Sequence, residues 1–293
     1  MSAPAQSAGT IARPAKEPLT PGQIAAARAR RRYKALIITL RIVLLVAFLG
    51  AWEISAERKW IDPFFFAQPS GIANQIWVWV TEGTSQGPLW RQIVVTLEET
   101  GLGFIIGAAG GIVAGIILGR NRLLADVFSL YIKIANSVPR VVLGSVFIIA
   151  LGLGMASKVA LAVVMVFFVV FGNAFQGVRE ADRAMIANAQ ILGASPWRIT
   201  TAVIIPSAMS WILASLHVSF GFALVGAVVG EFLGAREGVG LLISTAQGAF
   251  NANGVFAAMI ILAVLALVVE MIITWIEDIL VKWKPTPQLD TGN

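Results

Sequence analysis

Long apolar segments separated by short polar ones are the main feature of this sequence. Six of these segments are long enough to cross a bilayer, which takes about 20 residues of α-helix. Because lipid offers no partner to a backbone polar group, we predict that each segment is a helix. The predicted spans cover residues 35–54, 93–119, 123–152, 157–178, 203–233 and 254–280.

Composition also indicates a membrane protein. Of the 293 residues, 57% are hydrophobic and 13% are charged, whereas a soluble domain carries about 25% charged residues. We therefore predict an all-α integral membrane protein. Its domains are a basic, disordered tail at 1–34 that becomes a membrane-surface helix, a membrane domain at 35–281 and a second tail at 282–293. The first apolar run starts near residue 35, so we expect a retained span and no cleaved signal peptide.

The distribution of basic residues predicts the orientation, because cytoplasmic segments carry the excess of Lys and Arg. Most of the 22 Lys and Arg residues lie in the two tails and in the loops on the same side of the membrane. The segments on the other side hold only Arg58, Lys59, Arg91, Lys158 and Arg236. We therefore expect both termini to be cytoplasmic. The basic residues form no stripe with aromatic residues, so a nucleic-acid partner is not expected.

A stripe of glycines runs along the second span. These glycines are spaced four residues apart: Gly103, Gly107, Gly111, Gly115 and Gly119. Another helix can approach closely along such a stripe, because no side chain intervenes. The partner helix could belong to the same subunit, to a second subunit or to a moving surface.

Polar residues inside the spans are candidates for a solute pathway. The third span holds Lys133, Asn136 and Arg140 on one predicted helical face, with Pro139 able to bend the helix. Ionisable groups in spans usually face a bundle interior or a water-filled cavity, and a cationic lining suits an anionic solute. Alternatively, Lys133 reaches the membrane interface and Arg140 pairs with an acid such as Glu231 or Glu270.

Two further residues could contribute to a pathway. Glu231, near the end of the fifth span, is either a gate residue or a helix-end carboxylate. The glycine-rich stretch after it is consistent with a re-entrant turn or a short gate helix. His217 is the only histidine, which excludes a multi-histidine metal site. It could line the pathway, but an interhelical hydrogen bond is the simpler role.

The sequence holds no catalytic motif and no phosphate-binding loop of the form Gly-x-x-x-x-Gly-Lys-Ser/Thr. It also has no cysteine, which excludes disulfides and thiolate metal sites. We therefore expect no enzyme activity and no cofactor in this chain. Any ATP must be used by a partner.

The segment "ILGASPWRITTAVIIP" at 191–206 is too polar to be a span. We predict a helix up to Leu192, a stop at Gly193 and a second helix running through Arg198 toward Pro206. Small residues at Ala187, Ala189 and Ala194 would suit insertion into a cleft on another protein.

This segment resembles the EAA loop of bacterial ABC importer permeases, which reads Glu-Ala-Ala, three residues, Gly, nine residues, Ile-x-Leu-Pro. Here Ala187-Asn188-Ala189 is followed at the same spacing by Gly193 and by Val203-Ile204-Ile205-Pro206. Ala187 replaces the glutamate of the motif, which removes any salt bridge at that position. "QPSGIANQIW", "GLGMASKVALA" and "GAVVGEFLGAREGVGLLI" resemble the nitrate, sulfonate and taurine branch of the same permeases.

The resemblance implies a type I ABC importer permease in the bacterial inner membrane. Its partners would be ATPase subunits that bind ATP, a second permease subunit in a homodimer, an external solute-binding protein and membrane lipid. The coupling loop at 179–202 would transmit ATP-driven closure of the ATPases to the spans. The implied ATPase-coupling residues are Ala187, Asn188, Ala189, Gly193, Ala194, Ser195, Arg198 and Pro206. Nitrate, a sulfonate, taurine and a vitamin precursor all remain candidate solutes.

Two other functions are compatible with the residues. A self-contained carrier or channel could use Lys133, Arg140, Glu231 and Glu270 as an ion path, without an ATPase. A non-transporting scaffold protein would use the glycine stripe as its main surface.

Overall fold

The structure is a computed structural model that describes residues 21–280. It divides the chain after Arg58 into two parts, which are described separately. The described part of the first holds helix α1 (Pro21–Glu57). The second holds α2 (Pro63–Phe66), α3 (Pro69–Thr81), α4 (Leu89–Arg120), α5 (Arg122–Ser137), α6 (Arg140–Leu151), α7 (Met155–Arg179), α8 (Arg183–Ile191), α9 (Pro196–Ile199), a π-helical turn (Thr200–Ile204), α10 (Ile205–Leu233), α11 (Val239–Gly248) and α12 (Ala252–Leu280).

Helix α1 forms the first predicted span and extends beyond it. Its segment Arg28–Glu57 is long and apolar enough to cross a membrane. Residues 21–34, the basic end of the predicted tail, are helical and continuous with this span. Residues 1–20 and the predicted tail at 282–293 lie outside the described residues.

Four helical segments of the second part are also long and apolar enough to span a membrane. They are α4, α7, α12 and the stretch Pro196–Leu233, which contains α10. The predicted third span, 123–152, is not one helix. It is the pair α5 and α6, which meet at an angle of 87°. Pro139 has no N–H and disfavours helical geometry at the preceding residue, and Val138 is extended, with ψ at 126°. This proline therefore divides the span.

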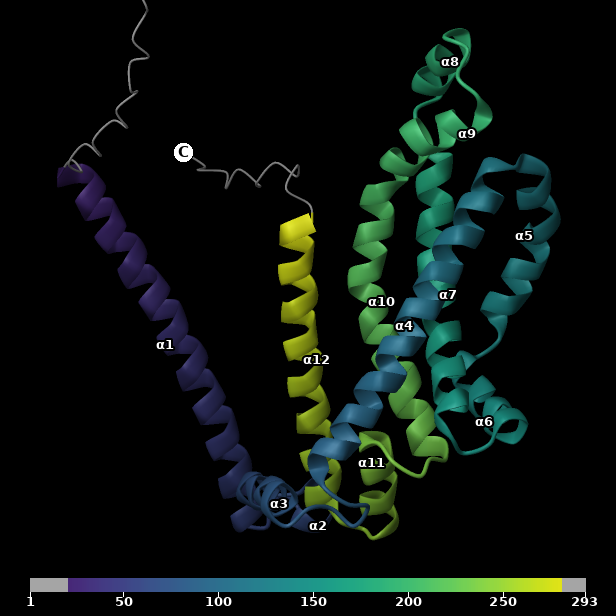
Figure 1. The fold of residues 1–293 in the computed structure, drawn as a ribbon. Coiled ribbons are helices and arrows are strands. Elements are labelled where there is room, and N and C mark those ends of the chain that lie inside the picture. The colour runs from purple at the N-terminus through teal and green to yellow at the C-terminus, as the bar shows by residue number, and fades with distance from the viewer. Residues whose placement is uncertain (1–20, 281–293) are drawn as a thin grey trace, which may run out of the picture. The chain divides into compact units, whose positions relative to one another are not determined.

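Helices α4, α7 and α10 pack side by side and hold most of the buried residues (Figure 1). The glycine stripe of α4 lies against α7. A Cβ added at Gly111 would be 2.9 Å from Phe167 O and Phe171 N, and one at Gly115 would be 2.7 Å from the Ala174 side chain. The stripe therefore packs within one subunit, and the two backbones approach too closely for a larger residue.

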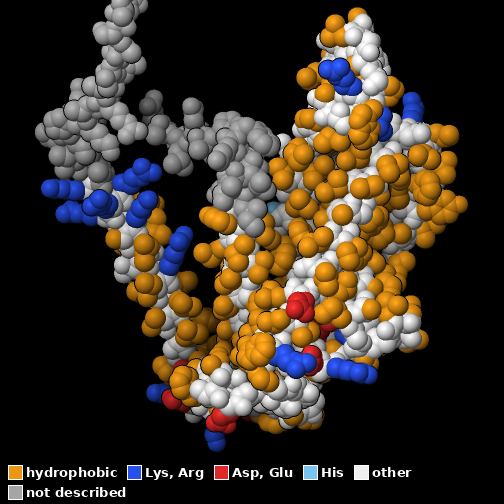
Figure 2. All heavy atoms as spheres, viewed as in Figure 1, with side chains coloured by type: hydrophobic (Ala, Val, Ile, Leu, Met, Phe, Trp, Pro, Cys, Tyr) orange, Lys and Arg blue, Asp and Glu red, His pale blue; other side chains and the backbone are white. Residues whose placement is uncertain are grey.

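The two ends of this helix layer carry different elements (Figure 1). Helices α8 and α9 lie at one end, where α7 ends and α10 begins; we call this the coupling-loop end. Helices α2, α3 and α11 lie at the other, which we call the α11 end. A helix of 29 residues such as α10 is about 44 Å long at 1.5 Å per residue. Figure 2 shows hydrophobic side chains along these helices, as expected for contact with lipid.

Candidate functional site

Five polar or charged side chains are buried together at the α11 end, and we call them the carboxylate cluster. They are Gln92, Thr96 and Glu99 on α4, Lys158 on α7 and Glu231 on α10. Each is at most 3% exposed. An ionisable group inside a span is costly to bury, so the cluster is a functional candidate.

The cluster holds the first turn of α11. A helix leaves its first N–H groups without partners of its own, and no side chain of the α11 segment caps them. Cluster side chains accept these hydrogen bonds instead: Gly238 N donates to Gln92 Oε1 at 2.7 Å, Val239 N to Thr96 Oγ1 at 2.9 Å and Gly240 N to Glu231 Oε2 at 2.6 Å. Thr96 Oγ1 also donates to Glu231 Oε1 at 2.7 Å. Helix α11 is thereby fastened to α4 and α10.

Two glycines make this approach possible. Gly238 has φ at +116°, a backbone conformation that residues with a side chain rarely adopt. A Cβ at this position would also overlap the Glu231 carboxylate. A Cβ at Gly240 would overlap Val228 O. The glycine-rich stretch after the fifth span therefore forms a tight turn and a short helix, and the Glu231 carboxylate caps that helix.

Lys158 supplies the positive charge of the cluster. Its Nζ donates to Leu153 O at 2.6 Å and to Gly154 O at 3.2 Å, and its charge interacts with Glu99 and Glu231. Glu99 Oε2 is buried and accepts no hydrogen bond from the described residues. We had counted Lys158 among the loop charges that indicate orientation, but the structure buries it at the start of α7.

Only Glu231 of this cluster was predicted from the sequence as a functional residue. Gln92, Thr96 and Glu99 lie four and three residues apart, so they share one face of a helix. That spacing at the start of an apolar span was a detectable signal. Nothing in the sequence indicated that Lys158 and α11 would meet this face.

The predicted coupling loop is a defined helix–turn–helix at the opposite end. The Asp182 side chain caps α8, and that of Ser195 caps α9. Gly193 has φ at +75° and ends α8, with Gly193 N bonded to Gln190 O at 2.9 Å and Ala194 N bonded to Ala189 O at 3.0 Å. These two hydrogen bonds form a Schellman motif, in which glycine is the usual left-handed residue.

The exposed surface of this loop differs from our expectation. Ala189 and Ala194 are half-buried against the loop's own core, which includes Ile199 and Ile204, while Ala187 and Asn188 are exposed. The large exposed apolar residues are Ile191, Leu192 and Trp197, which are 83%, 86% and 71% exposed. The protruding surface is therefore apolar and bulky.

Pro206 and Arg198 lie at the base of the loop. The helix continues through Pro206, where a ring and a missing N–H would disturb α-helical bonding. The π-helical turn just before it, closed by the bond from Ile205 N to Thr200 O, widens the helix at that point. Arg198 is exposed on α9.

The other predicted pathway residues do not meet Glu231. Asn136 and Lys133 lie on α5, whereas Arg140 begins α6, so the three residues do not share one helix. Arg140 Nη2 donates to Asn136 Oδ1 at 2.8 Å across the break, and the guanidinium lies over the Phe168 ring. The contacts of Arg140 are thus Asn136 and Phe168, whereas Glu231 is bonded to Thr96 and Gly240.

His217 and Glu270 form a separate pair between α10 and α12. His217 Nε2 lies 3.7 Å from Glu270 Oε1, and both residues line a pocket of about 270 Å³. His217 therefore makes an interhelical contact, and its partner is a carboxylate.

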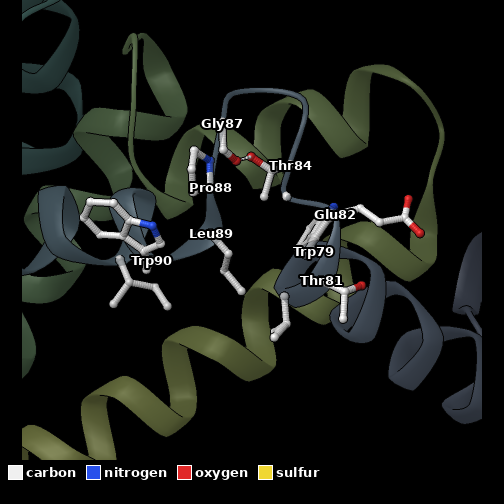
Figure 3. A pocket seen from close by; sticks show the side chains of 11 residues that line it. Trp79, Thr81, Glu82, Thr84, Gly87, Pro88, Leu89 and Trp90 are labelled. Atoms are coloured by element: carbon white, nitrogen blue, oxygen red, sulfur yellow. Dashed lines mark hydrogen bonds between the residues drawn. The ribbon is translucent and has the colours of Figure 1, made fainter.

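A larger pocket of about 630 Å³ lies between the end of α3 and the start of α4. In Figure 3, Trp79 and Trp90 lie on opposite sides of it, with Pro88 and Leu89 between them, and the Glu82 carboxylate points away from Trp90. No Lys, Arg or His is among the described residues that line it. This lining is unsuited to an anion.

The chain is similar to known transport proteins in sequence and in fold. The chain is 30% identical to the putative aliphatic sulfonates transport permease protein SsuC of Bacillus subtilis (strain 168), over 68% of this chain and 72% of the relative. It is 28% identical to the riboflavin transport system permease protein RibX of Chloroflexus aurantiacus, over 87% of this chain and 92% of the relative. The structure of the MetNI methionine ABC transporter in an inward-facing conformation matches with a TM-score of 0.58 and 18% identity, over 68% of this chain and 96% of that one.

The structural match supports the predicted all-α permease fold, and the relatives are named as transport subunits. A family model for the inner membrane component of binding-protein-dependent transport systems matches residues 111–283. That range contains α7, the coupling loop, α10 and α11. The chain therefore belongs to the family of binding-protein-dependent transport system inner membrane components, the permease subunits of ABC importers.

Proposed function

We propose that two copies of this chain form the membrane path of an ATP-driven importer for a small anionic solute. Partner ATPases bind the ATP and act on residues 187–206, and an external binding protein delivers the solute. Both termini and the coupling loop then face the cytoplasm, where ATP is available, and the α11 end faces outward. The permease itself needs no cofactor.

The apolar tip of the coupling loop carries this proposal. Ile191 and Leu192 are more than four-fifths exposed, and they protrude from a loop whose turn is fixed by Gly193 and the Ser195 cap. Exposed apolar side chains on a rigid element are typical of a docking surface. ATP binding would shift the permease between two arrangements through different contacts of this tip in each.

Cross-linking from the tip tests the proposal. The chain has no cysteine, so one introduced thiol is unique. Leu192→Cys is suited to this, whereas Ser195→Cys would remove the cap of α9. A short thiol-to-amine cross-linker is applied in native membranes, and the captured protein is identified by mass spectrometry. The matched control is Ser85→Cys, at an exposed position between α3 and α4.

Capture of a protein with a Gly-x-x-x-x-Gly-Lys-Ser/Thr phosphate loop by Leu192→Cys, and not by Ser85→Cys, is the expected result. Failure of Leu192→Cys to capture such a protein, with that protein expressed, would favour a self-contained carrier. Uptake into proteoliposomes without ATP would also favour a self-contained carrier.

The break between α5 and α6 is the proposed place of the solute path. Lys133 is exposed there and Arg140 is half-buried, so two cations lie beside a bend in a span. A sulfonate permease among the relatives fits an anion, whereas the riboflavin permease is named for a different solute. We expect Arg140→Gln to lower uptake of a sulfonate, taurine or nitrate and Arg140→Lys to preserve more of it. Equal uptake in all three proteins would make Arg140 structural.

A second copy is proposed to close this path. Ser137, at the end of α5, is exposed beside the break. In a two-fold dimer, a residue near the axis lies close to its own copy. Ser137→Cys should therefore cross-link to itself in membranes, while Ser85→Cys should not. Cross-linking of Ser137→Cys to a different permease chain would indicate a heterodimer.

A further inference from the structure

A second large pocket, of about 680 Å³, lies at the corner where α4 ends and α5 begins, beside the coupling loop. Its apolar wall includes Val113 and Ile117 of α4 and Leu124 of α5. Val113 and Ile117 are each more than half exposed. This wall therefore continues the membrane-facing surface of a spanning helix.

Two arginines line the same pocket. Arg120 is the last residue of α4, and its Nη2 donates to Pro196 O at 3.3 Å. Arg122 begins α5; its Nε lies 3.9 Å from Asp126 Oδ2, and its side chain is 94% exposed. A guanidinium has five N–H donors, so these single contacts leave both side chains able to bind an anion. The Arg122–Asp126 pair is long and solvated, and such pairs are weak.

The remaining polar features of the corner also favour an anion. The Asn121 side chain caps α5 by accepting a hydrogen bond from Leu124 N at 3.2 Å. The start of this 16-residue helix carries partial positive charge beside the arginines. Trp197 of α9 also lines the pocket and is 71% exposed. Tryptophan is typical of the membrane interface, where one end of a side chain is apolar and the other is wet.

We propose that this pocket binds an anionic phospholipid from the leaflet on the coupling-loop side. The phosphate lies between Arg120 and Arg122, and one acyl chain follows Val113, Ile117 and Leu124. A free phosphate would leave the apolar wall uncovered, and a zwitterionic lipid would add an ammonium group beside two cations. Basic pockets between spanning helices are suited to anionic head groups for the same reasons.

The pocket also touches the coupling loop through Arg120 and Trp197. A bound lipid would therefore support the base of α9, a consequence that rests on the proposed function. Lipid binding itself does not depend on it, and the two are tested separately.

Native mass spectrometry of the full chain tests the binding. The protein is purified with the subunits that accompany it and exposed to equal amounts of phosphatidylglycerol and phosphatidylcholine. The wild type should retain phosphatidylglycerol selectively. Replacing Arg120 and Arg122 with Gln should weaken that retention by about fivefold for each arginine, and replacing both with Lys should preserve most of it.

The matched control removes the same charge at the same end but outside the pocket. Arg179→Gln with Arg183→Gln should retain phosphatidylglycerol as the wild type does. Equal retention by the Arg120/Arg122 Gln variant, or equal retention of the two lipids by the wild type, would overturn the proposal. Displacement of the lipid by inorganic phosphate alone would also overturn it, because it would show that the apolar wall contributes nothing.

Tryptophan quenching tests the position of the lipid. Phosphatidylglycerol brominated on its acyl chains should quench more fluorescence than brominated phosphatidylcholine, and Trp197→Phe should remove that difference. Persistence of the difference in Trp197→Phe would place the lipid elsewhere. A cross-link from Leu124→Cys to a partner subunit, without retained lipid, would assign the pocket to that subunit and overturn the proposal.

The same variants distinguish this proposal from the proposed function. In the Arg120/Arg122 Gln background, Leu192→Cys should still capture the ATPase while lipid retention falls. Failure of Leu192→Cys to capture the ATPase in the otherwise wild-type chain, with phosphatidylglycerol still retained, would contradict the coupling function alone.

Discussion

The two ends of the helix layer differ in how their polar groups are buried and bonded. At the α11 end, Glu231 and Lys158 are fully buried and hydrogen-bonded to backbone groups of neighbouring segments. At the coupling-loop end, polar groups cap local turns, and the large apolar residues Leu192 and Ile191 face outward.

This difference separates two mechanical roles. The carboxylate cluster binds α11 to α4 and α10 through side chains from distant parts of the sequence, so these elements must move together. The coupling loop is stabilised by hydrogen bonds within the loop and by its base, so under the proposed function it would dock without rearranging. Perturbations of the two ends should therefore differ in kind: stability at one end, partner contact at the other.

Glu231→Leu should have the largest effect. It leaves Lys158 buried with less opposing charge and removes the acceptor of Gly240 N, and breaking a buried charge network costs about 3–5 kcal/mol of stability. Thermal unfolding of the purified chain in detergent measures the loss. The control is Glu237→Gln, whose carboxylate is 33% exposed and pairs with Arg91 at 2.6 Å; surface pairs contribute at most about 1 kcal/mol. Equal losses would mean that the cluster does not hold this end together.

Gly111→Ala tests the packing that connects the two ends. The new Cβ would be 2.9 Å from backbone atoms of α7, and overpacking costs about 1–3 kcal/mol. Gly172→Ala, on α7 itself, meets open space, so it should stabilise the helix by up to about 1 kcal/mol. Opposite shifts in thermal stability are expected. A stabilised Gly111→Ala variant would show that α4 and α7 pack less closely.

Gly193→Val acts on the coupling-loop end only. A Cβ there meets no atom within 4 Å, but φ is +75°, and that backbone geometry costs a residue with a side chain about 1–2 kcal/mol. ATP-driven uptake should fall, while global thermal stability changes little because the exposed loop can distort locally to relieve this cost. Gly193→Asn should retain more uptake, because asparagine tolerates this conformation. Equal uptake by the Val and Asn variants would show that the turn geometry does not matter for coupling.

Ser195→Ala should have the smallest effect. Its hydroxyl accepts a hydrogen bond from Arg198 N at 3.3 Å, and loss of a helix cap costs about 1 kcal/mol. Ser195→Asp preserves an acceptor and serves as the control. Hydrogen exchange at α9 should rise in the Ala variant only, with the α11 end unchanged. Faster exchange at the α11 end would contradict the separation of the two regions.

The helix–turn–helix form of the coupling loop could be predicted from the sequence because its hydrogen bonds are local. The stop at Gly193 follows from residue type and position, and Ser195, which caps α9, lies within the same short segment. Which side chains of the loop are exposed could not be predicted, because the packing of Ala189 and Ala194 depends on the core beneath the loop. Pro139 gave a signal for a bend but not for its 87° angle, which neighbouring helices decide.

The sequence by itself determined that the chain is a multi-span helical permease with a helix–turn–helix between two spans, since hydrophobic length and local turn chemistry depend on neighbours in the chain. Only the tertiary structure decided which polar groups meet. Thr96, Lys158 and Glu231 are far apart in sequence, and nothing in the sequence indicates that their helices bring them together. Their burial is stable only because three helices and the start of α11 bring donors and acceptors to one place, and one-dimensional periodicity does not encode that convergence.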